Sequence, residues 1–439
     1  MLGAAKAFAA AVKADGNNAE HRFNLGIVLE AAGNTSGAAE QLTNALQIDP
    51  QMTAASRRLC WLLGRSKLPD GVRLNRQGLK AALTHDTADR DLLAAATLHH
   101  LSQTLPLRRI LERGAQRGWR DAALDTCLGK DQEILGDSLF LETLRRGVVT
   151  SPAIEDFLTA VRAALLLDVP RARFEDLRLV RMAVALMQQC WLNEFVWAET
   201  PEELQALASQ AIAGDMVLAG DRAAAQAFMV RSMYRPPTDV LGCVQPDALS
   251  RVEPQVLRDA LVTRMTEEHE ILDRARRIPR LGTIQDATSI KVATQYNVSP
   301  YPRWTGVLTY RENHYLKNLS TIFDNKELHF LRSPFEVLIA GCGTGRQAVS
   351  AALDYGPNAR VTGLDITETS LGYASMMAER MNAKTFRSFK ATSRISARSQ
   401  RRFGSGSTSS NASACCTTWR VRSTAGVRSK SAWRRAASC

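Results

Sequence analysis

The sequence of 439 residues lacks long hydrophobic runs and closely spaced cysteines. No run of about eighteen apolar residues occurs, which argues against a transmembrane helix and against membrane contact. The eight cysteines are scattered and none forms a Cys-x-x-Cys pair. We therefore expect free thiols, no zinc site and a location in the reducing cytoplasm.

Acidic residues and leucine are missing from the end of the chain. From Lys384 onward there are thirteen Lys or Arg and no Asp, Glu or Leu. The net charge of the whole chain is +12, so removing the +13 of this tail leaves −1 for the rest. Without acids or an apolar period, residues 383–439 cannot supply several buried strands, and they are predicted to be a disordered basic tail.

Two interpretations of the tail are open. It is either a basic arm that binds nucleic acid, or the product of a shifted reading frame. In the shifted frame, the codons from Gly406 to Trp419 admit the string Phe-Asp-Val-Val-Glu-Cys-Val-Gly-Val-Leu-His-His-Met. We favour a frameshift near residues 382–385. Each shifted codon overlaps two printed codons, and a few of these overlaps permit almost no other amino acid. Nucleic-acid binding is expected only if the tail is genuine.

Glycine is concentrated after one short apolar run. Gly341, Gly343 and Gly345 follow the run Val337–Ala340, and the helix-forming segment Gln347–Leu353 comes next. A buried parallel strand, a glycine-rich turn and a helix form the first unit of a nucleotide-binding α/β sheet. The glycines allow the backbone to approach a ligand, and the helix N-terminus offers free N–H groups.

A second unit of the same kind follows. Ala359–Leu364 predicts a strand that ends at Asp365, and Thr369–Met381 predicts a helix. Asp365 comes 24 positions after Gly341 (365 minus 341), near the roughly 20 expected of an acid that binds ribose hydroxyls. A dinucleotide fingerprint needs a third glycine where this chain has Arg346, which disfavours NAD.

The N-terminal region has the pattern of helical repeats. Ala19–Pro50 matches one tetratricopeptide repeat, with small residues where two helices cross and Gly33-Asn34 at the turn. Residues 4–11 and Ala54–Arg65 predict parts of neighbouring repeats. Such arrays bind peptides, so a protein or peptide partner is expected.

The middle of the chain is helical in pattern up to Arg277, with Thr200 predicted as an N-cap. The segment Gln295–Trp304 is different, because two closely spaced prolines exclude a helix. It is either an interdomain linker that packs its own aromatic rings or a lid over a cofactor or substrate. Both interpretations stay open.

These features together resemble bacterial repeat-containing class I S-adenosylmethionine-dependent methyltransferases. The resemblance rests on the repeats, the helical middle, Tyr-x-x-x-Pro-Tyr-Pro-Arg-Trp and Val-Leu-Ile-Ala-Gly-Cys-Gly-Thr-Gly, and it covers residues 4–381. It implies a Rossmann-like, doubly wound sheet of about seven strands with the cofactor at the switch point. Only two of those strands are recognisable here. The strings hidden in the shifted frame resemble the missing third and fourth strands.

The predicted fold class is α + α/β, with an incomplete Rossmann-like methyltransferase domain after the helices. The predicted domains are TPR-like repeats at 1–68, an all-α domain at 69–277, a linker with the aromatic and proline segment at 278–319, the N-terminal part of the methyltransferase domain at 320–382 and the tail at 383–439.

The resemblance implies a transferase that methylates an unknown substrate and is weakly active or inactive in this form. No catalytic residue, methyl acceptor or oligomeric state follows from it. Cys342 is interpreted as a small residue of the loop, because no base lies near it in the sequence. Alternatives are a repeat scaffold without catalysis, or nucleic-acid binding by the tail. The implied S-adenosylmethionine-binding residues are Ala340, Gly341, Cys342, Gly343, Thr344, Gly345, Asp365 and Ile366.

Overall fold

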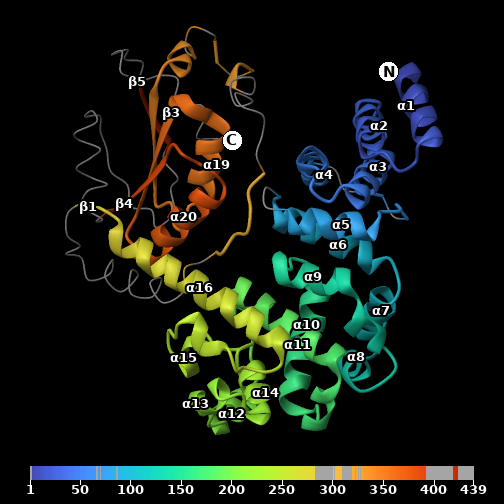
Figure 1. The fold of residues 1–439 in the computed structure, drawn as a ribbon, viewed down its shortest axis with the longest axis vertical. Helices are drawn as coiled ribbons and strands as arrows, with labels where there is room; N and C mark the ends of the chain where they lie inside the picture. Colours follow the sequence, from blue (N-terminus) through green and yellow to red (C-terminus); the bar gives the residue numbers. More distant parts are fainter. Residues whose placement is uncertain are drawn as a thin grey trace. The chain divides into compact units, whose positions relative to one another are not determined.

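The computed structural model describes residues 2–65, 68–69, 71–85, 88–281, 300, 302–308, 319–321, 323–324, 326, 328–391 and 419–423. They fall into two units (Figure 1). The helical unit comprises Met1–His269 and Pro302–Leu308, and the sheet unit comprises Glu270–Tyr301 and Thr309–Cys439. One helix, α16 (Gln255–Arg277), begins in the helical unit and ends in the sheet unit.

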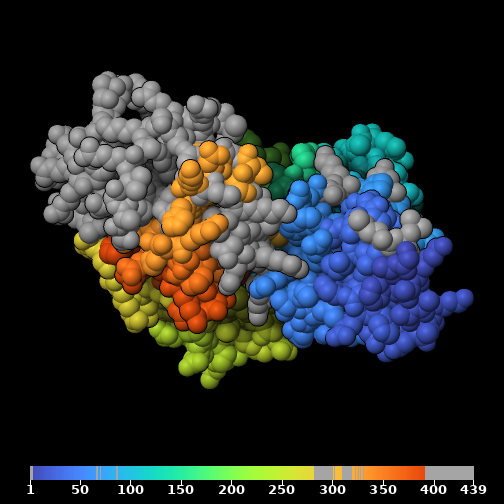
Figure 2. Space-filling view, turned by 90° about the horizontal axis from the view of Figure 1, so that it is seen from above, coloured from blue at the N-terminus to red at the C-terminus, as the bar shows by residue number. Residues whose placement is uncertain are grey.

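Helices α2 (Ala19–Ala31) and α3 (Thr35–Ile48) form a helical hairpin. Gly33 turns the chain with a φ of +82°, and the Asn34 side chain caps the N-terminus of α3. The atoms of α1 to α4 (blue) form one continuous surface in Figure 2. The hairpin is the one that the sequence predicts, whereas its assignment to the tetratricopeptide repeats stays a prediction.

Helices on both sides of residue 68 share one hydrophobic core. The N–H of Asn75, which precedes α5 (Arg76–Thr84), donates to Thr43 Oγ1 of α3 at 3.1 Å. Residues 1–68 and 69–277 are therefore not two separate compact units, in contrast to the sequence-based boundary. Four leucines show the shared core, since all are fully buried in one cluster: Leu42, Leu46, Leu79 and Leu83.

Replacing Gly78 by alanine is expected to destabilise the helical unit by about 1–3 kcal/mol. An added Cβ would lie 1.8 Å from the Thr43 carbonyl oxygen, a backbone atom that cannot rotate away. Gly3→Ala is the matched control, because its Cβ meets no described heavy atom within 4 Å and alanine favours a helix by up to about 1 kcal/mol. Urea unfolding followed by circular dichroism measures both changes. Equal midpoints for the two variants would contradict this close helix crossing.

Most other helices of the helical unit agree with the predicted pattern. α12 begins with a capping box, as Thr200 predicts, because Thr200 and Glu203 each accept a hydrogen bond from the other's N–H. The remaining helices are α1 (Leu2–Ala14), α4 (Thr53–Arg65), α6 (Arg90–Ser102), α7 (Leu107–Arg117), α8 (Trp119–Cys127), η1 (Gln132–Gly136), α9 (Ser138–Arg146), α10 (Pro152–Leu167), η2 (Arg171–Glu175), α11 (Leu177–Leu192), α12 (Pro201–Ser209), α13 (Gly214–Leu218), α14 (Arg222–Arg231), α15 (Thr238–Leu241) and η3 (Pro246–Leu249).

The segment Pro302–Leu308 returns from the sheet unit and is anchored in the helical unit. Trp304 is buried, with 1% of its surface exposed. Thr305 donates from its hydroxyl to the Arg146 carbonyl at 3.0 Å, and its own carbonyl accepts from Arg90 at 3.1 Å. These contacts fix the segment at both its side chains and its backbone.

This anchoring changes the interpretation of the aromatic and proline segment. The end of Gln295–Trp304, from Pro302 on, belongs to the helical unit, where Trp304 is buried, whereas Pro300 falls in the sheet unit. The other two aromatic residues of the segment lie outside the described residues. The predicted linker at 278–319 is likewise not uniform, since 302–308 belongs to the helical unit. Residues 282–299, 301 and 309–318 lie outside the described part of the chain.

The sheet unit contains five described strands in the order β1-β4-β3-β2-β5. β2 (Phe335–Ala340), β3 (Ala359–Asp365) and β4 (Phe386–Ala391) are parallel neighbours, and β1 (Arg280–Leu281) extends the parallel part at one edge. β5 (Trp419–Ser423) pairs antiparallel with β2 at the other edge.

β4 and β5 correct the sequence-based limits of the domain. The sequence pattern indicates only two strands and predicts a disordered tail at 383–439, whereas β4 and β5 both lie within that range. β4 is missed because its sequence, Phe-Arg-Ser-Phe-Lys-Ala, has neither an apolar run nor strict alternation. Residues 392–418 and 424–439 lie outside the described residues, and with them most of the tail to which the frameshift and nucleic-acid interpretations refer.

Two helices connect the parallel strands on one face of the sheet (Figure 1). α19 (Arg346–Tyr355) leads from β2 to β3, and α20 (Glu368–Arg380) leads from β3 to β4. Successive right-handed crossovers in one direction place both helices on the same face. Val337 and Val361 are buried, while Glu336 on the alternate side of β2 is exposed, so burial alternates along the strands.

The last turns of α16 are part of the sheet unit and pack against α20. Arg274 pairs with Glu379 at 2.8 Å, and Arg380 pairs with Glu270 at 3.2 Å. A short η4 helix (His329–Arg332) precedes β2, and η5 (Gly356–Asn358) precedes β3.

Candidate functional site

The turn between β2 and α19 is fastened to the end of β3 through the backbone. The Gly341 and Cys342 N–H groups both donate to the Leu364 carbonyl, at 2.7 and 3.0 Å. Gly341, Gly343 and Gly345 have positive φ values of +70°, +51° and +81°. A side chain with a Cβ costs about 1–2 kcal/mol in this conformation, so the turn requires its glycines.

Asp365, the last residue of β3, is oriented by two backbone N–H groups. The Gly343 N–H donates to Oδ2 at 2.8 Å, and the Thr367 N–H donates to Oδ1 at 2.9 Å. A carboxylate has about four acceptor positions, so each oxygen keeps capacity for a ligand hydroxyl. The structure therefore brings Asp365 to the glycine loop, as the spacing predicts, whereas ligand binding by these residues stays a prediction.

Two glycines of the loop have no described neighbour at the position of a side chain. A Cβ built on Gly341 or Gly343 meets no heavy atom of the described residues within 4 Å. By contrast, a Cβ on Gly345 would lie 2.4 Å from Ala374 Cβ, so this glycine allows α20 to approach the loop. A glycine backbone that no described side chain covers and a carboxylate at the strand end are what the methionine and ribose parts of S-adenosylmethionine require. The residues present therefore fit this cofactor.

Cys342 is not an activated nucleophile. Burial and the nearby Asp365 carboxylate both raise the pKa of its thiol above the ordinary value. A thiol that keeps its proton is a weak nucleophile. Its sulfur instead fills space against β3, since a Cβ on Gly363 would lie 2.9 Å from Cys342 Sγ. This environment supports its interpretation as a small loop residue.

The other predicted residues lie near the hydrogen bond between Gly343 and Asp365. Ala340 ends β2 opposite Leu364 of β3, which places the loop and Asp365 at the same edge. Gly341 is exposed, Thr344 and Gly345 are buried, and the remaining members of the predicted set are partly buried, namely Ala340, Cys342, Gly343, Asp365 and Ile366. The carboxyl ends of parallel strands are where ligands bind in open α/β sheets.

A charged cluster beside this edge is missing from the sequence-based site. Glu368, at the start of α20, pairs with Lys390 of β4 at 2.7 Å and with Arg280 of β1 at 2.8 Å. Burial raises the pKa of Glu368, but the hydrogen bond from Lys390 and the positive charges of Lys390 and Arg280 lower it below the ordinary value. Only the strand register, which sets Lys390 opposite Asp365, brings these residues together.

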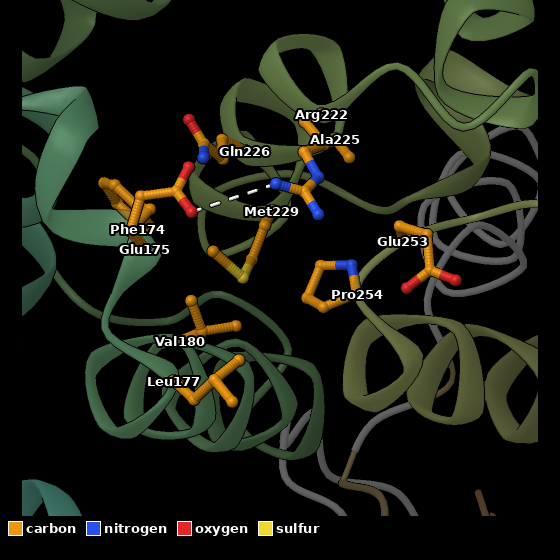
Figure 3. Close-up of a pocket in the computed structure, with 10 residues that line it drawn as sticks. All are labelled: Phe174, Glu175, Leu177, Val180, Arg222, Ala225, Gln226, Met229, Glu253 and Pro254. Carbon is orange, nitrogen blue, oxygen red and sulfur yellow. Dashed lines mark ion pairs between the residues drawn. The ribbon is translucent and has the colours of Figure 1, made fainter.

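A separate hollow lies in the helical unit, between α11, α14 and the residues before α16 (Figure 3). Arg222 and Glu175 face each other there at 3.8 Å, and both are exposed. The lining includes no Ser, Cys, His or Lys, so it offers no obvious nucleophile. The ten lining residues are Phe174, Glu175, Leu177, Val180, Arg222, Ala225, Gln226, Met229, Glu253 and Pro254.

Two kinds of feature are absent from the described part of the chain. Its side chains include no group of three or more His, Cys, Asp or Glu placed to hold a metal ion. None of its helices combines the length and apolar character needed to span a bilayer.

Comparison with known proteins supports a methyltransferase. Residues 332–394 match the family model of a methyltransferase domain, and this range contains β2, α19, β3, α20 and β4. No curated protein and no solved structure matches the chain. The match extends beyond residue 382, and it agrees with β4 in carrying the domain past the limit set from the sequence.

Proposed function

We propose that this chain is a class I methyltransferase that uses S-adenosylmethionine. The observation that carries the proposal is the contact of the Gly343 N–H with Asp365 Oδ2 at 2.8 Å, at the carboxyl edge of β2 and β3. It lies within the segment that matches the methyltransferase domain model. Arg346 at the third-glycine position favours this cofactor over NAD.

The chain's residues would hold the cofactor in two places. The loop around Gly341 and Gly343 would contact the methionine part, and Asp365 would accept hydrogen bonds from the ribose hydroxyls, next to Ala340 and Ile366. When bound, S-adenosylmethionine supplies a methyl group made electrophilic by the sulfonium. The protein's contribution is to position this group toward an acceptor nucleophile and to exclude water. The acceptor and the catalytic residues are not assigned.

Asp365→Ala is expected to weaken S-adenosylmethionine binding by about 1–3 kcal/mol, because the ribose hydroxyls would lose their acceptor on binding. The Gly343 and Thr367 N–H groups would lose theirs as well. Isothermal titration calorimetry measures the change. If this chain binds the cofactor weakly, the same titration is made on a frame-restored chain, in which the proposed frameshift near residues 382–385 is reversed. NAD should bind both this chain and the frame-restored chain more weakly than S-adenosylmethionine does.

Glu336→Ala is the matched control for that substitution. Glu336 is an exposed carboxylate near the opposite end of β2, 4.0 Å from Arg360. Its removal should leave cofactor affinity unchanged, since an exposed pair of this kind contributes little. If Asp365→Ala and Glu336→Ala bind the cofactor equally well, Asp365 does not belong to the site.

The proposal also covers the completeness of the methyltransferase domain and the location of the protein in the cell. We propose a cytoplasmic protein whose methyltransferase domain is incomplete, with weak or no activity, because a basic tail replaces the strands that the family resemblance implies. The nucleotide sequence from Asn382 onward distinguishes a frameshifted tail from a genuine one. Salt-sensitive binding to DNA or RNA would favour the genuine tail.

A second candidate function is partner binding by the helical unit. The α2–α3 hairpin, capped by Asn34 and turned at Gly33, favours it, because stacked helical hairpins present surfaces for peptides. A frame-restored chain that binds a peptide partner but no S-adenosylmethionine would support a scaffold without catalysis.

A further inference from the structure

Three charged residues form one row across the sheet, at the strand end that carries the candidate site. The strand pairing sets Arg280 of β1 opposite Lys390 of β4, and Lys390 opposite Asp365 of β3. Residues paired across parallel strands point to the same face of the sheet, and neighbouring strands lie about 5 Å apart. Lys390 is therefore the cross-strand neighbour of the carboxylate that the proposed function assigns to the ribose hydroxyls.

The ammonium of Lys390 is paired with Glu368 and not with its cross-strand neighbour. Lys390 Nζ lies 2.7 Å from Glu368 Oε1, and Arg280 Nη2 lies 2.8 Å from the same oxygen. Glu368 thus holds both cations of the row. The Lys390 side chain is only 20% exposed, so water can replace this partner only in part. The two oxygens of Asp365 accept backbone N–H groups instead.

The start of α20 brings the two carboxylates into their separate roles. Glu368 is the first residue of α20, where the helix dipole favours an acidic side chain. The residue before it, Thr367, donates its N–H to Asp365 Oδ1 at 2.9 Å. The same turn of the chain therefore orients Asp365 and carries the acid that holds Lys390.

We propose that Glu368 is a positioning residue, which keeps the Lys390 ammonium away from Asp365 so that Asp365 can accept from the ribose hydroxyls. This role rests on the proposed function. A carboxylate has about four acceptor positions, and backbone N–H groups use two of those of Asp365. Without Glu368, Lys390 would turn to Asp365, because a buried ammonium needs an anion. Its charge-assisted hydrogen bond would then occupy positions that the hydroxyls need.

Calorimetric titration of this chain with S-adenosylmethionine tests the role. Glu368→Ala should weaken binding about tenfold, because the ribose loses a hydrogen bond to a charged acceptor. Glu368→Gln should weaken it less, since the amide oxygen can still accept from Lys390. Glu379→Ala, which removes an exposed acid in the last turn of α20, should leave the affinity unchanged. Equal affinities of the native chain and Glu368→Ala would overturn the proposal.

A double variant separates this positioning role from a purely structural one. In Glu368→Ala, Lys390→Met, the methionine keeps an apolar stem but has no ammonium, so the affinity should return to that of the native chain. If Glu368 only anchors α20 to β1 and β4, the double variant should bind no better than Glu368→Ala, and the proposal fails. Circular dichroism confirms that the variants are folded.

Failure of the proposed function gives a different result. Lys390 follows the proposed frameshift, so reversing that shift replaces it, and the variants are therefore made in this chain. If neither this chain nor the frame-restored chain binds S-adenosylmethionine, the proposed function is wrong, and the role of Glu368 with it. If only the frame-restored chain binds the cofactor, the proposed function holds and the role of Glu368 is overturned.

Discussion

Arg303→Ala is expected to destabilise the helical unit by about 3–5 kcal/mol, because it removes one partner of a buried ion cluster. Arg303 Nε is 2.5 Å from Glu194 Oε1, and Nη2 is 2.7 Å from Glu268 Oε1. The side chains of Arg303 and Glu194 are only 4% and 5% exposed. The substitution would leave the Glu194 carboxylate desolvated without this cation.

Urea unfolding at pH 7 measures the loss, and an exposed ion pair provides the control. Arg108 lies 3.7 Å from Glu112, with both side chains more than half exposed, so Arg108→Ala should cost less than about 1 kcal/mol. Arg303→Lys should fall between these values, because an ammonium cannot reproduce the two-sided guanidinium contact. If Arg303→Ala costs no more than Arg108→Ala, the cluster does not stabilise the fold.

The pH dependence of this effect follows from Glu268. Burial raises its pKa, but Arg264 and Arg303 lower it below the ordinary value of 4.5. A carboxyl whose pKa is lower in the folded state stabilises the fold above its unfolded pKa, and this contribution is lost as the pH falls through the folded value. The difference in unfolding free energy between the native protein and Arg303→Ala should therefore shrink as the pH falls below 4.5.

The same cluster holds a strained stretch of backbone. Glu194 and Phe195 have φ values of +53° and +58°, a region that costs non-glycine residues about 1–2 kcal/mol each. The ion pair of Glu194 with Arg303 offsets part of this strain. The sequence does not reveal the pair, because its members lie 109 positions apart and the motif that contains Arg303 does not indicate a partner for it.

Features with local causes were predictable from the sequence. The strand, glycine turn and helix at Val337–Leu353 are encoded within one short stretch, and so is the capping box at Thr200. Asp365 could be placed at the loop because consecutive parallel strands set its distance along the chain. In each case a few neighbouring residues determine the geometry.

Features that depend on long-range pairing were not predictable. β4 adds to the sheet through the edge of β3, although its own sequence has no strand period. Lys390 meets Glu368 only because that register is formed. The anchoring of Pro302–Leu308 likewise depends on the helical unit that receives it, not on its prolines. Tertiary contacts outweighed local propensity at each of these places.

Glu203→Ala is expected to destabilise the helical unit by about 3–5 kcal/mol, since it leaves a buried arginine without its carboxylate. The side chains of Arg162 and Glu203 are 0% and 1% exposed, with Nη2 and Oε1 3.5 Å apart. Glu203 also accepts from the Tyr234 hydroxyl at 2.6 Å and from the Thr200 N–H at 2.8 Å. One substitution therefore removes an acceptor from two buried donors, Arg162 and the Tyr234 hydroxyl, and from the partly buried Thr200 N–H.

Glu202→Ala is the matched control, because Glu202 is the exposed neighbour in the same helix and should change stability by less than about 0.5 kcal/mol. The double variant Arg162→Met, Glu203→Leu should lose less stability than Glu203→Ala, because it removes both charges and keeps apolar volume. Urea unfolding of all three variants tests this order. A double variant less stable than Glu203→Ala would show that attraction between Arg162 and Glu203 outweighs the cost of desolvating them.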